Sequence, residues 1–598
     1  MPTKNVKLLA LTALENTWGN SEDIVFSGEW CKLYERKHVW GARHHETIPF
    51  HWDDREKLKK DYDYLESLHH SLLTSLTDTL NRLHGVNYST RYWQILLDPW
   101  LMSYISVLFD RWECLRYAFE FFDEYKIYFT TETIKPSFSY DDYLTQIFSD
   151  EWNQIIYQRI IENSPLKKSI IRKAKASCTS PKVSSKSNGN KKSIYNLKNL
   201  FGKAANLLDQ LIGKYVYNYN VVFYWSYFDL FELISLNVSI GQIPRLFVNE
   251  FDQNRVNGLS DLKISESIRN NLQIDFAAKS SFETFIKKFI FHDMPVSIIE
   301  GYEHLSQYVK KIPIKTKAIV TANAHWGNIV AKFWFAEQIQ KGVRLIILEH
   351  GGSLPAHKEL FDFEEDISDL KGTWFSPYHK KHQQVPPSRL IKKYRDLSPH
   401  YHGKYCCFIG NEHPRWVHRI HFYPMAAQCL RSFDMTVQLY NYLDKSIGRH
   451  VKIKPPPYSS YLALNTEQRF KDILGEDHVL SEPTVDKVFK LAKLIVCTYP
   501  ETTFAEAMTS GIPTVMFYPE EFYERHPSTQ PLLDILHQAN IVFHDPKSIA
   551  EHINCIWSEP WRWWSSSQVI KAREAFKKSA ANVSIDWKNQ WVQFLLNI

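Results

Sequence analysis

The segment from residue 318 to residue 352 constrains the fold most, because it alternates between strand-like and helix-like patterns. Ala318–Ala322 (AIVTA) and Val343–Leu348 (VRLIIL) are short apolar runs, and Gly327–Gln340 between them has apolar residues at helical spacing. A strand, a helix and a strand in this order form a β-α-β unit, which implies a parallel sheet. The sequence therefore predicts an α/β fold, in which ligands bind beyond the carboxyl ends of the strands.

A second α/β block begins near residue 404. Its predicted elements are the strands Tyr405–Ile409, Val451–Ile453, Leu494–Cys497 and Thr514–Tyr518 and the helix Phe504–Ser510. A proline-containing linker near residues 385–403 separates the two blocks, and a chain of 598 residues has room for several domains. We therefore expect two Rossmann-like domains, residues 1–390 and 400–570, that face each other across a cleft.

The N-terminal part is predicted to be a mainly helical elaboration of the first domain. Leucines recur at three- and four-residue steps within Asp53–Phe122, as one apolar helix face requires. Val6–Leu11, Asp23–Ser27 and Lys126–Thr130 are predicted short strands, and Val216–Val238 is predicted to be a buried, aromatic-rich helix.

The segment Pro165–Lys192 has a different composition, with nine basic residues, many serines and no acidic residue. Such a segment buries little apolar surface, so we expect a disordered, solvated loop in residues 165–192. The alternative is a basic patch that contacts anionic lipid or an anionic substrate.

Charge and cysteine content narrow the function classes. The 72 basic and 66 acidic residues give a formal charge of +6, which is too mild over this length to indicate a nucleic-acid partner. The eight cysteines form no CxxC pair, and the N-terminus has no cleavable signal, so we expect a cytoplasmic protein. An apolar run long enough to cross a membrane is also missing.

Several catalytic motifs are missing. The sequence has no GxxxxGK[ST] phosphate loop and no GxGxxG after a strand, which argues against P-loop NTPases and NAD-dependent enzymes. HEXXH, GxSxG and DxD patterns are missing too, so we expect no metal and no resident cofactor.

Thr502 and Thr503 are the best phosphate-binding candidates. They follow a predicted strand and begin a helix, where hydroxyl and N–H groups bind anions with help from the helix dipole. A plain helix cap explains them equally well, with Glu506 closing a capping box from Thr503. Lys454 follows another strand and precedes three prolines, so it is either a cleft lysine that neutralises phosphate or a surface lysine before a stiff loop.

His350 is the leading catalytic candidate. It follows an apolar strand and precedes Gly351 and Gly352, which allow tight turns and close ligand approach. A histidine there can accept a proton near neutral pH, and Glu349 can orient it or act in its place. The alternative is a histidine that packs in a turn.

Several segments resemble a family of transferases found in O-antigen and surface-polysaccharide gene clusters. The segments that carry the resemblance are Thr12–Glu15 with Trp18, Phe26–Cys31, His51–Arg55, Arg91–Trp93, Pro99–Trp100, His350–Gly352 with the acidic stretch to Asp369, Pro414–Arg415, Thr502–Glu506 and Trp563–Trp564. The Thr-Thr-x-x-Glu-Ala…Gly-x-Pro pattern is shared by many GT-B glycosyltransferases. The resemblance thus implies a GT-B-like fold, with a C-terminal helix in residues 571–598 that packs back towards the N-terminal domain.

The resemblance also implies site roles. His350 resembles the proposed base of CDP-glycerol transferases, and it stands where the similar motif of Kdo and sialyl transferases has an aspartate as the base. This sequence also has Pro456 where the donor motif of the Kdo and sialyl transferases has a histidine. On the donor side we expect Lys454, Thr502, Thr503, Glu506, Gly410 and Arg415, with Arg415 reaching the phosphate across the cleft. On the acceptor side we expect Gly351, Gly352, Asn323 and His325.

The predicted function is transfer of a sugar, with CMP-activated Kdo or sialic-type sugars among the candidates, from a nucleotide donor to a surface-polysaccharide acceptor. The expected partners are a nucleotide-sugar donor, a glycan or lipid-linked glycan acceptor and the inner membrane face, but no nucleic acid. The alternatives are a CDP-glycerol-like polyol-phosphate transferase and a non-catalytic glycan-binding assembly protein.

Overall fold

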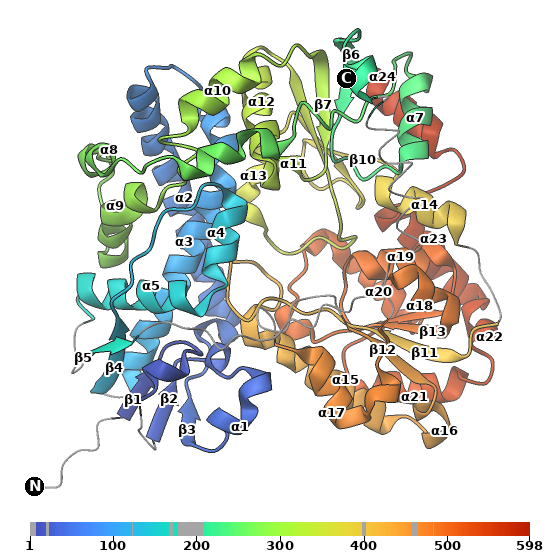
Figure 1. The fold of residues 1–598 in the computed structure, drawn as a ribbon. Helices are drawn as coiled ribbons and strands as arrows, with labels where there is room; N and C mark the ends of the chain where they lie inside the picture. The colour runs from blue at the N-terminus through green and yellow to red at the C-terminus, as the bar shows by residue number, and fades with distance from the viewer. Residues whose placement is uncertain are drawn as a thin grey trace, which may run out of the picture.

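The computed structural model describes residues 7–19, 23–121, 124–166, 171–176, 207, 209–397, 402–455, 464–481 and 484–597. Within these residues the chain is a mixed α/β protein with three five-stranded sheets, all of whose strand pairs are parallel (Figure 1). The prediction of two Rossmann-like domains was therefore incomplete, because the N-terminal strands form a separate sheet.

The N-terminal sheet has the strand order β3-β2-β1-β4-β5. Its strands are β1 (Lys7–Ala10), β2 (Asp23–Phe26), β3 (His44–Thr47), β4 (Tyr125–Thr130) and β5 (Ile171–Ala176), and its helices are α1 (Lys37–Trp40), α2 (Arg55–His84), α3 (Thr90–Phe121), α4 (Tyr140–Ile147) and α5 (Asp150–Asn163). The long helices α2 and α3 run between this sheet and the second one (Figure 1).

Two predictions for this part need correction. Ile171–Ala176 lies inside the segment expected to be a disordered loop, but it pairs with β4 as the fifth strand; residues 177–192 lie outside the described residues. Val216–Val238 was expected to be one helix but contains strand β6 and helix α7. In β6 exposed and buried residues alternate at first, as a half-buried strand requires.

The second sheet has the strand order β10-β9-β8-β7-β6. Its strands are β6 (Asn218–Phe223), β7 (Lys315–Thr321), β8 (Arg344–Leu348), β9 (Leu370–Thr373) and β10 (His382–Gln384). Its helices are α7 (Leu230–Ser239), α8 (Glu266–Asn271), α9 (Ser281–Asp293), α10 (Tyr302–Lys310), α11 (Ala324–Gly327), α12 (Ile329–Gln340), α13 (Phe363–Ile367) and α14 (Ser388–Asp396).

The third sheet has the strand order β12-β11-β13-β14-β15. Its strands are β11 (Tyr405–Ile409), β12 (Val451–Lys454), β13 (Ala492–Cys497), β14 (Thr514–Phe517) and β15 (Val542–Phe543). The helices of this part are α15 (Cys429–Tyr442), α16 (Lys445–Gly448), α17 (Thr466–Leu474), α18 (Val485–Leu491), α19 (Thr502–Ser510), α20 (Gln530–Gln538), α21 (Pro546–Ile556), α22 (Pro560–Trp564), α23 (Ser567–Ala580) and α24 (Trp587–Leu596).

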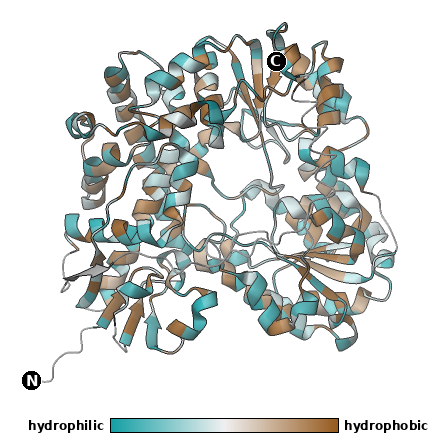
Figure 2. Cartoon of the chain, viewed as in Figure 1, coloured by the Kyte–Doolittle hydropathy of each residue, from teal (hydrophilic) through white to brown (hydrophobic). Residues whose placement is uncertain are grey.

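Hydrophobic packing joins the three parts. One cluster of buried side chains links the N-terminal sheet, α2 and α3 to one face of the second sheet, and another links the second sheet to the third. The strands of the third sheet are mostly hydrophobic (Figure 2). At the C-terminus, α24 lies against α7, where the Trp591 indole donates to the carbonyl of Pro386 at 2.9 Å.

Candidate active site

The carboxyl ends of the second and third sheets meet. The backbone N–H of Gly352, just after β8, donates to Oγ1 of Thr502 at the start of α19 over 2.9 Å. Beside this contact Ala356 and Arg525 form an antiparallel bridge between the same two parts of the chain. The structure therefore brings together the two loops that the sequence singled out separately, as parallel sheets allow at their carboxyl edges.

A different physical constraint requires glycine at each of the two positions after His350. A Cβ on Gly351 would lie 2.4 Å from Oγ1 of Thr502, closer than real side chains come. Gly352 has a φ of +87°, a conformation that residues with a side chain rarely adopt. Gly351 therefore permits the close approach of Thr502, and Gly352 permits the turn.

A cavity of about 470 Å³ opens at this junction. Its walls come from the loop after β8, from α13, and from the segment around His526. Among the lining residues are Glu349, His350, Glu364, Lys371 and Tyr378. The cavity is therefore rich in ionisable groups, as expected of a catalytic site.

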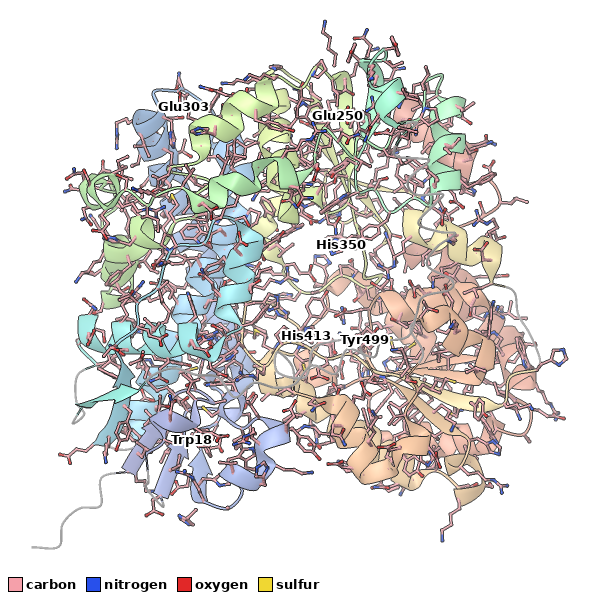
Figure 3. All side chains as sticks on the ribbon, in the orientation of Figure 1. Trp18, Glu250, Glu303, His350, His413 and Tyr499 are labelled. Atoms are coloured by element: carbon pink, nitrogen blue, oxygen red, sulfur yellow. The ribbon has the colours of Figure 1, made fainter. Side chains whose placement is uncertain are left out.

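His350 is exposed to solvent at the carboxyl end of β8. In Figure 3 it lies near the centre of the molecule, and His413 and Tyr499 of the third part lie below it. The surrounding protein lowers the pKa of His350 by desolvation, and the carboxylate of Glu364 partly opposes this effect. The ring is thus neutral at pH 7 and able to accept a proton.

Glu349 points towards the neighbouring strand. Its carboxylate accepts a hydrogen bond from the backbone N–H of Trp374, and its carbonyl accepts one from the Trp374 indole at 2.8 Å. Burial raises the pKa of Glu349 to about 7. The residue therefore fixes the end of β8 against the start of the loop after β9.

His325 does not line the cavity, which corrects the sequence prediction. It is fully buried, and its Nε2 lies 3.2 Å from Oε1 of Glu364. Lys371 binds the other oxygen of Glu364 at 3.0 Å. Burial alone would raise the pKa of Glu364, but Lys371 and His325 outweigh it and hold that pKa well below its usual range. His325 therefore acts on the cavity through Glu364.

The donor-side candidates divide into two groups. Gly410 follows β11, and its N–H donates to the carbonyl of Lys454 at the end of β12 over 3.1 Å. The Lys454 ammonium donates to the carbonyl of Pro455 at 2.8 Å; Pro456 and Pro457 lie outside the described residues. These groups share the carboxyl edge of the third sheet with Thr502.

Thr503 and Glu506 are engaged within the protein. The Thr503 hydroxyl hydrogen-bonds the Tyr499 hydroxyl, and neither Thr502 nor Thr503 is the N-cap, which is Glu501. Glu506 is buried and pairs with Arg389 of α14 at 3.0 Å. Glu506 therefore ties α19 to α14, and donor contact would require this pair to open.

Arg415 also requires correction. Its side chain is buried, and its guanidinium pairs with Asp150 and with the carbonyl of Trp30 in the N-terminal part. Trp416 beside it packs on Trp30, with ring centroids 5.4 Å apart. Arg415 thus anchors the segment after β11 to the first sheet, in place of the phosphate contact expected from sequence.

Asn323 lies at the carboxyl end of β7. Its amide donates to the hydroxyl of Tyr227 at 2.9 Å, and it does not line the cavity of 470 Å³. Sequence reasoning missed Glu364 and Lys371 as site residues. The acidic stretch that ends at Asp369 contains Glu364 and could have indicated it, but the partners of Glu364 and Lys371 depend on tertiary packing.

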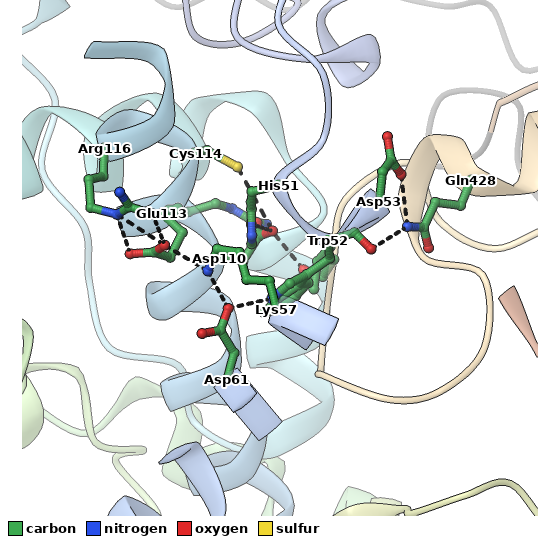
Figure 4. A network of polar contacts seen from close by, with 12 residues as sticks. His51, Trp52, Asp53, Lys57, Asp61, Asp110, Glu113, Cys114, Arg116 and Gln428 are labelled. Atoms are coloured by element: carbon green, nitrogen blue, oxygen red, sulfur yellow. Dashed lines mark hydrogen bonds and ion pairs between the residues drawn. The ribbon is translucent and has the colours of Figure 1, made fainter. Parts of the chain in front are cut away.

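A network of polar contacts lies where α2 begins beside α3 (Figure 4). In the described part of the chain, His51, Asp110 and Cys114 form a group whose ligand atoms lie close enough to hold a metal ion. Asp110 already pairs with Arg111, and burial raises the pKa of Cys114 well above its usual range, so the thiol stays protonated. A protonated thiol beside a guanidinium is a poor cation site, so we interpret the network as structural.

None of the helices in the described ranges combines the length and the apolar character needed to cross a membrane. The location of the protein in the cell stays a prediction from sequence.

Comparisons with known proteins identify a family and remote structural likenesses. A protein from Listeria monocytogenes, assigned as a UDP-N-acetylglucosamine 2-epimerase, is similar to 64% of this chain over 94% of its own length, with 7% identity and a TM-score of 0.36. No curated protein matches the sequence. The model of the LIC12162 family transferases matches residues 7–595, and the chain therefore belongs to this family of transferases.

Proposed function

We propose that the protein is a GT-B-type glycosyltransferase that moves a sugar from a nucleotide donor to a surface-polysaccharide acceptor. The observation that carries this proposal is the hydrogen bond from Gly352 to Thr502, which joins the carboxyl edges of two parallel sheets beside an exposed histidine. Nucleotides bind at such edges, and a cleft between two of them accommodates both substrates. In this proposal the N-terminal sheet is an addition to the GT-B core.

His350 acts as the general base. Its neutral ring accepts the proton of the acceptor hydroxyl as that oxygen attacks the anomeric carbon. The bond between the anomeric carbon and the donor phosphate oxygen breaks, and its electron pair stays on the phosphate. The exposure of His350 to the cavity and its lowered pKa both support this role.

The leaving phosphate is stabilised at the edge of the third sheet. Lys454 supplies a positive charge, and the N-terminus of α19, with Thr502 and Thr503, supplies backbone N–H groups and the positive end of the helix dipole. We propose that these groups suffice without a metal ion, so that EDTA leaves the rate unchanged.

We further propose a cytoplasmic reaction at the inner membrane face on a lipid-linked glycan of the O-antigen type. CMP-activated Kdo and sialic-type sugars are the first donors to test, followed by UDP-, GDP- and dTDP-sugars. A gain of one donor phosphate by the acceptor, measured as an increase in product mass that includes the phosphate, would instead indicate transfer of a polyol phosphate, the second candidate reaction.

The decisive experiment compares wild type, His350→Ala and His304→Ala. His304 is an exposed histidine of α10, so its variant controls for loss of an imidazole. We expect His350→Ala to lower nucleotide release by about 100- to 10,000-fold, as loss of a general base does, while nucleotide affinity and thermal stability stay unchanged. Equal turnover of the three proteins would contradict the assignment of His350.

A further inference from the structure

The exposed hydrophobic side chains of the protein are concentrated in one segment of the chain. Of the large hydrophobic side chains that are exposed in the described ranges, more than half lie within residues 207–248, which include β6 and α7. Single exposed apolar residues are ordinary, whereas a contiguous exposed apolar surface marks a site of interaction. This segment lies at one corner of the molecule, where β6, α7 and α24 are found together (Figure 1).

The outer face of α7 is apolar along its length. Its exposed large side chains follow one another at helical spacing, on one face of the helix: Leu230, Phe231, Ile234 and Val238. Phe231 is 72% exposed and Val238 is 63% exposed. The opposite face, with Leu233 and Leu236, is buried in the hydrophobic cluster between the second and third sheets. A surface helix ordinarily presents polar residues to solvent, so the outer face of α7 is unusual.

The acidic residues at the start of α7 do not give this face a negative charge. Asp229 pairs with Lys392, and the buried carboxylate of Glu232 pairs with Arg395. Both cations belong to α14, so the two carboxylates are neutralised from that side. The outer face of α7 is therefore apolar and uncharged.

Exposed lysines lie beside the start of β6. Lys315 and Lys317 begin β7, and the backbone N–H of Lys315 donates to the carbonyl of Tyr217 at 2.8 Å. The hydroxyl of Tyr217 in turn donates to the carbonyl of Lys214 at 2.5 Å. All three lysines are exposed, and none of them forms an ion pair with a residue of the described ranges.

The segment after α7 joins these lysines to the apolar helix face. The side chain of Gln242 accepts hydrogen bonds from two backbone N–H groups of β6, each at 3.1 Å. The backbone N–H of Leu246 donates to the carboxylate of Asp209 at 2.6 Å, just before the lysine-bearing turn. Ile243, between these two contacts, is exposed, and Tyr215 is 82% exposed. The apolar surface therefore continues from α7 to the lysines.

Two carboxylates near the lysines share one arginine. Asp209 and Glu250 both bind the buried guanidinium of Arg245, at 2.8 and 2.7 Å. Together these three groups leave one negative charge, against three positive charges on the lysines. This end of the surface is therefore positive as well as apolar.

We infer that the outer face of α7, with the lysines beside β6 and β7, binds a bilayer that contains anionic lipid. Aromatic and aliphatic side chains enter the boundary between headgroups and acyl chains, and lysines attract anionic headgroups, so the two effects add. A second copy of the chain fits this surface less well. In a two-fold dimer the same surface meets itself, which would bring the lysines of both copies together.

The surface begins at the sheet edge that carries the candidate active site. The hydroxyl of Tyr227, shortly before α7, accepts a hydrogen bond from Asn323 at the carboxyl end of β7. The next strand is β8, whose carboxyl end carries His350. A bilayer on α7 would therefore lie beside this edge, on the side from which a lipid-linked acceptor enters. The lipid-linked acceptor rests on the proposed function, whereas binding of the bilayer does not.

The test measures co-sedimentation of the full chain with vesicles of phosphatidylcholine alone and of phosphatidylcholine mixed with phosphatidylglycerol. The apolar variant combines Phe231→Ser and Val238→Ser, and the lysine variant combines Lys214→Gln, Lys315→Gln and Lys317→Gln. The matched controls replace exposed residues of other helices: Ile473→Ser with Ile535→Ser, and Lys60→Gln with Lys490→Gln and Lys571→Gln. Thermal unfolding of each variant verifies that it is folded.

We expect wild type to bind the mixed vesicles more tightly than phosphatidylcholine alone, and salt to weaken this binding. The lysine variant should bind the mixed vesicles about 10- to 100-fold more weakly, since each lysine near an anionic surface contributes about fivefold. The apolar variant should lose at least about tenfold, because two large side chains no longer leave water. Both controls should bind as wild type does. Failure of wild type to bind the mixed vesicles, or equal binding by either variant, would refute the surface.

Two further measurements separate the remaining outcomes. Light scattering without lipid reports the oligomeric state, and a dimer that the apolar variant dissociates would identify a second copy as the occupant and overturn the inference. Calorimetry of the same proteins with CMP, CDP, UDP and GDP tests the nucleotide donor independently. Nucleotide binding without vesicle binding would refute the membrane surface alone, whereas vesicle binding without nucleotide binding would support the surface and refute the nucleotide donor.

Discussion

An alanine at position 351 would place a methyl group 2.4 Å from Oγ1 of Thr502. Contacts of 3.4 Å or more are ordinary, so the turn and α19 would have to separate by about 1 Å. The same movement would stretch the 2.9 Å hydrogen bond from Gly352. Overpacking of this kind costs about 1–3 kcal/mol, which changes the equilibrium between the closed and the open junction by about 5- to 150-fold.

A second substitution should relieve the strain. Thr502→Ala removes Oγ1, after which the nearest atom of residue 502 to the new methyl group is Cβ at 3.7 Å, an ordinary contact. Thr502→Ala alone loses one hydrogen bond, which costs about 0.5–1.5 kcal/mol. Gly351→Ala should therefore add little in the Thr502→Ala background, which gives a coupling energy of about 1–3 kcal/mol.

Hydrogen exchange measures this effect without any assumption about activity. Exchange of the Gly352 amide, followed by mass spectrometry in the four proteins of the cycle, reports opening of the junction, and each 1.4 kcal/mol is about tenfold in rate. We expect each single variant to exchange faster than wild type and the double variant to match Thr502→Ala. Gly410→Ala is the control, because its Cβ would meet atoms at 3.9 and 4.0 Å. Additive effects of the two substitutions would refute the contact.

Three further predictions concern pH and stability. Because desolvation lowers the pKa of His350, its ring stays neutral somewhat below pH 6.5. The transfer rate should therefore fall only at lower pH. A pH–rate profile in which the rate falls only on the alkaline side would contradict this prediction. Arg415→Met leaves the carboxylate of Asp150, which is only 12% exposed, without its guanidinium partner. This loss should cost about 3 kcal/mol and lower the unfolding temperature far more than Arg431→Met, which removes an exposed arginine paired with Glu521. Burial lowers the pKa of Lys332 to about 8, and a depressed lysine pKa destabilises the fold below the usual lysine pKa. At pH 7, Lys332→Met should therefore have a free energy of unfolding about 3 kcal/mol larger than that of wild type and a higher unfolding temperature. This difference in stability should narrow from pH 8 to pH 10, and a difference that does not change with pH would contradict the prediction.

Local patterns predicted many elements of the second and third sheets. The apolar runs at β7, β8, β11 and β13 are short, buried on both faces and bounded by turns, so their sequence alone indicates parallel strands. The prediction was wrong where this signal is weak. β3 (HHET) is an exposed edge strand with polar residues, and β5 (IRKAKA) is basic. Neither the existence of the N-terminal sheet nor its strand order could be derived, because β1 pairs with β4 across two long helices.

The candidate site, like the fold, was predicted from the sequence only in part. The strand-to-turn positions of His350 and Thr502 follow from hydrophobic periodicity and from glycine, which act over a few residues. Only the tertiary structure decided that Gly352 binds Thr502 and that Arg415 pairs with Asp150. Charge pairing depends on which side chains lie within a few ångströms after packing, and separation along the chain does not determine that distance.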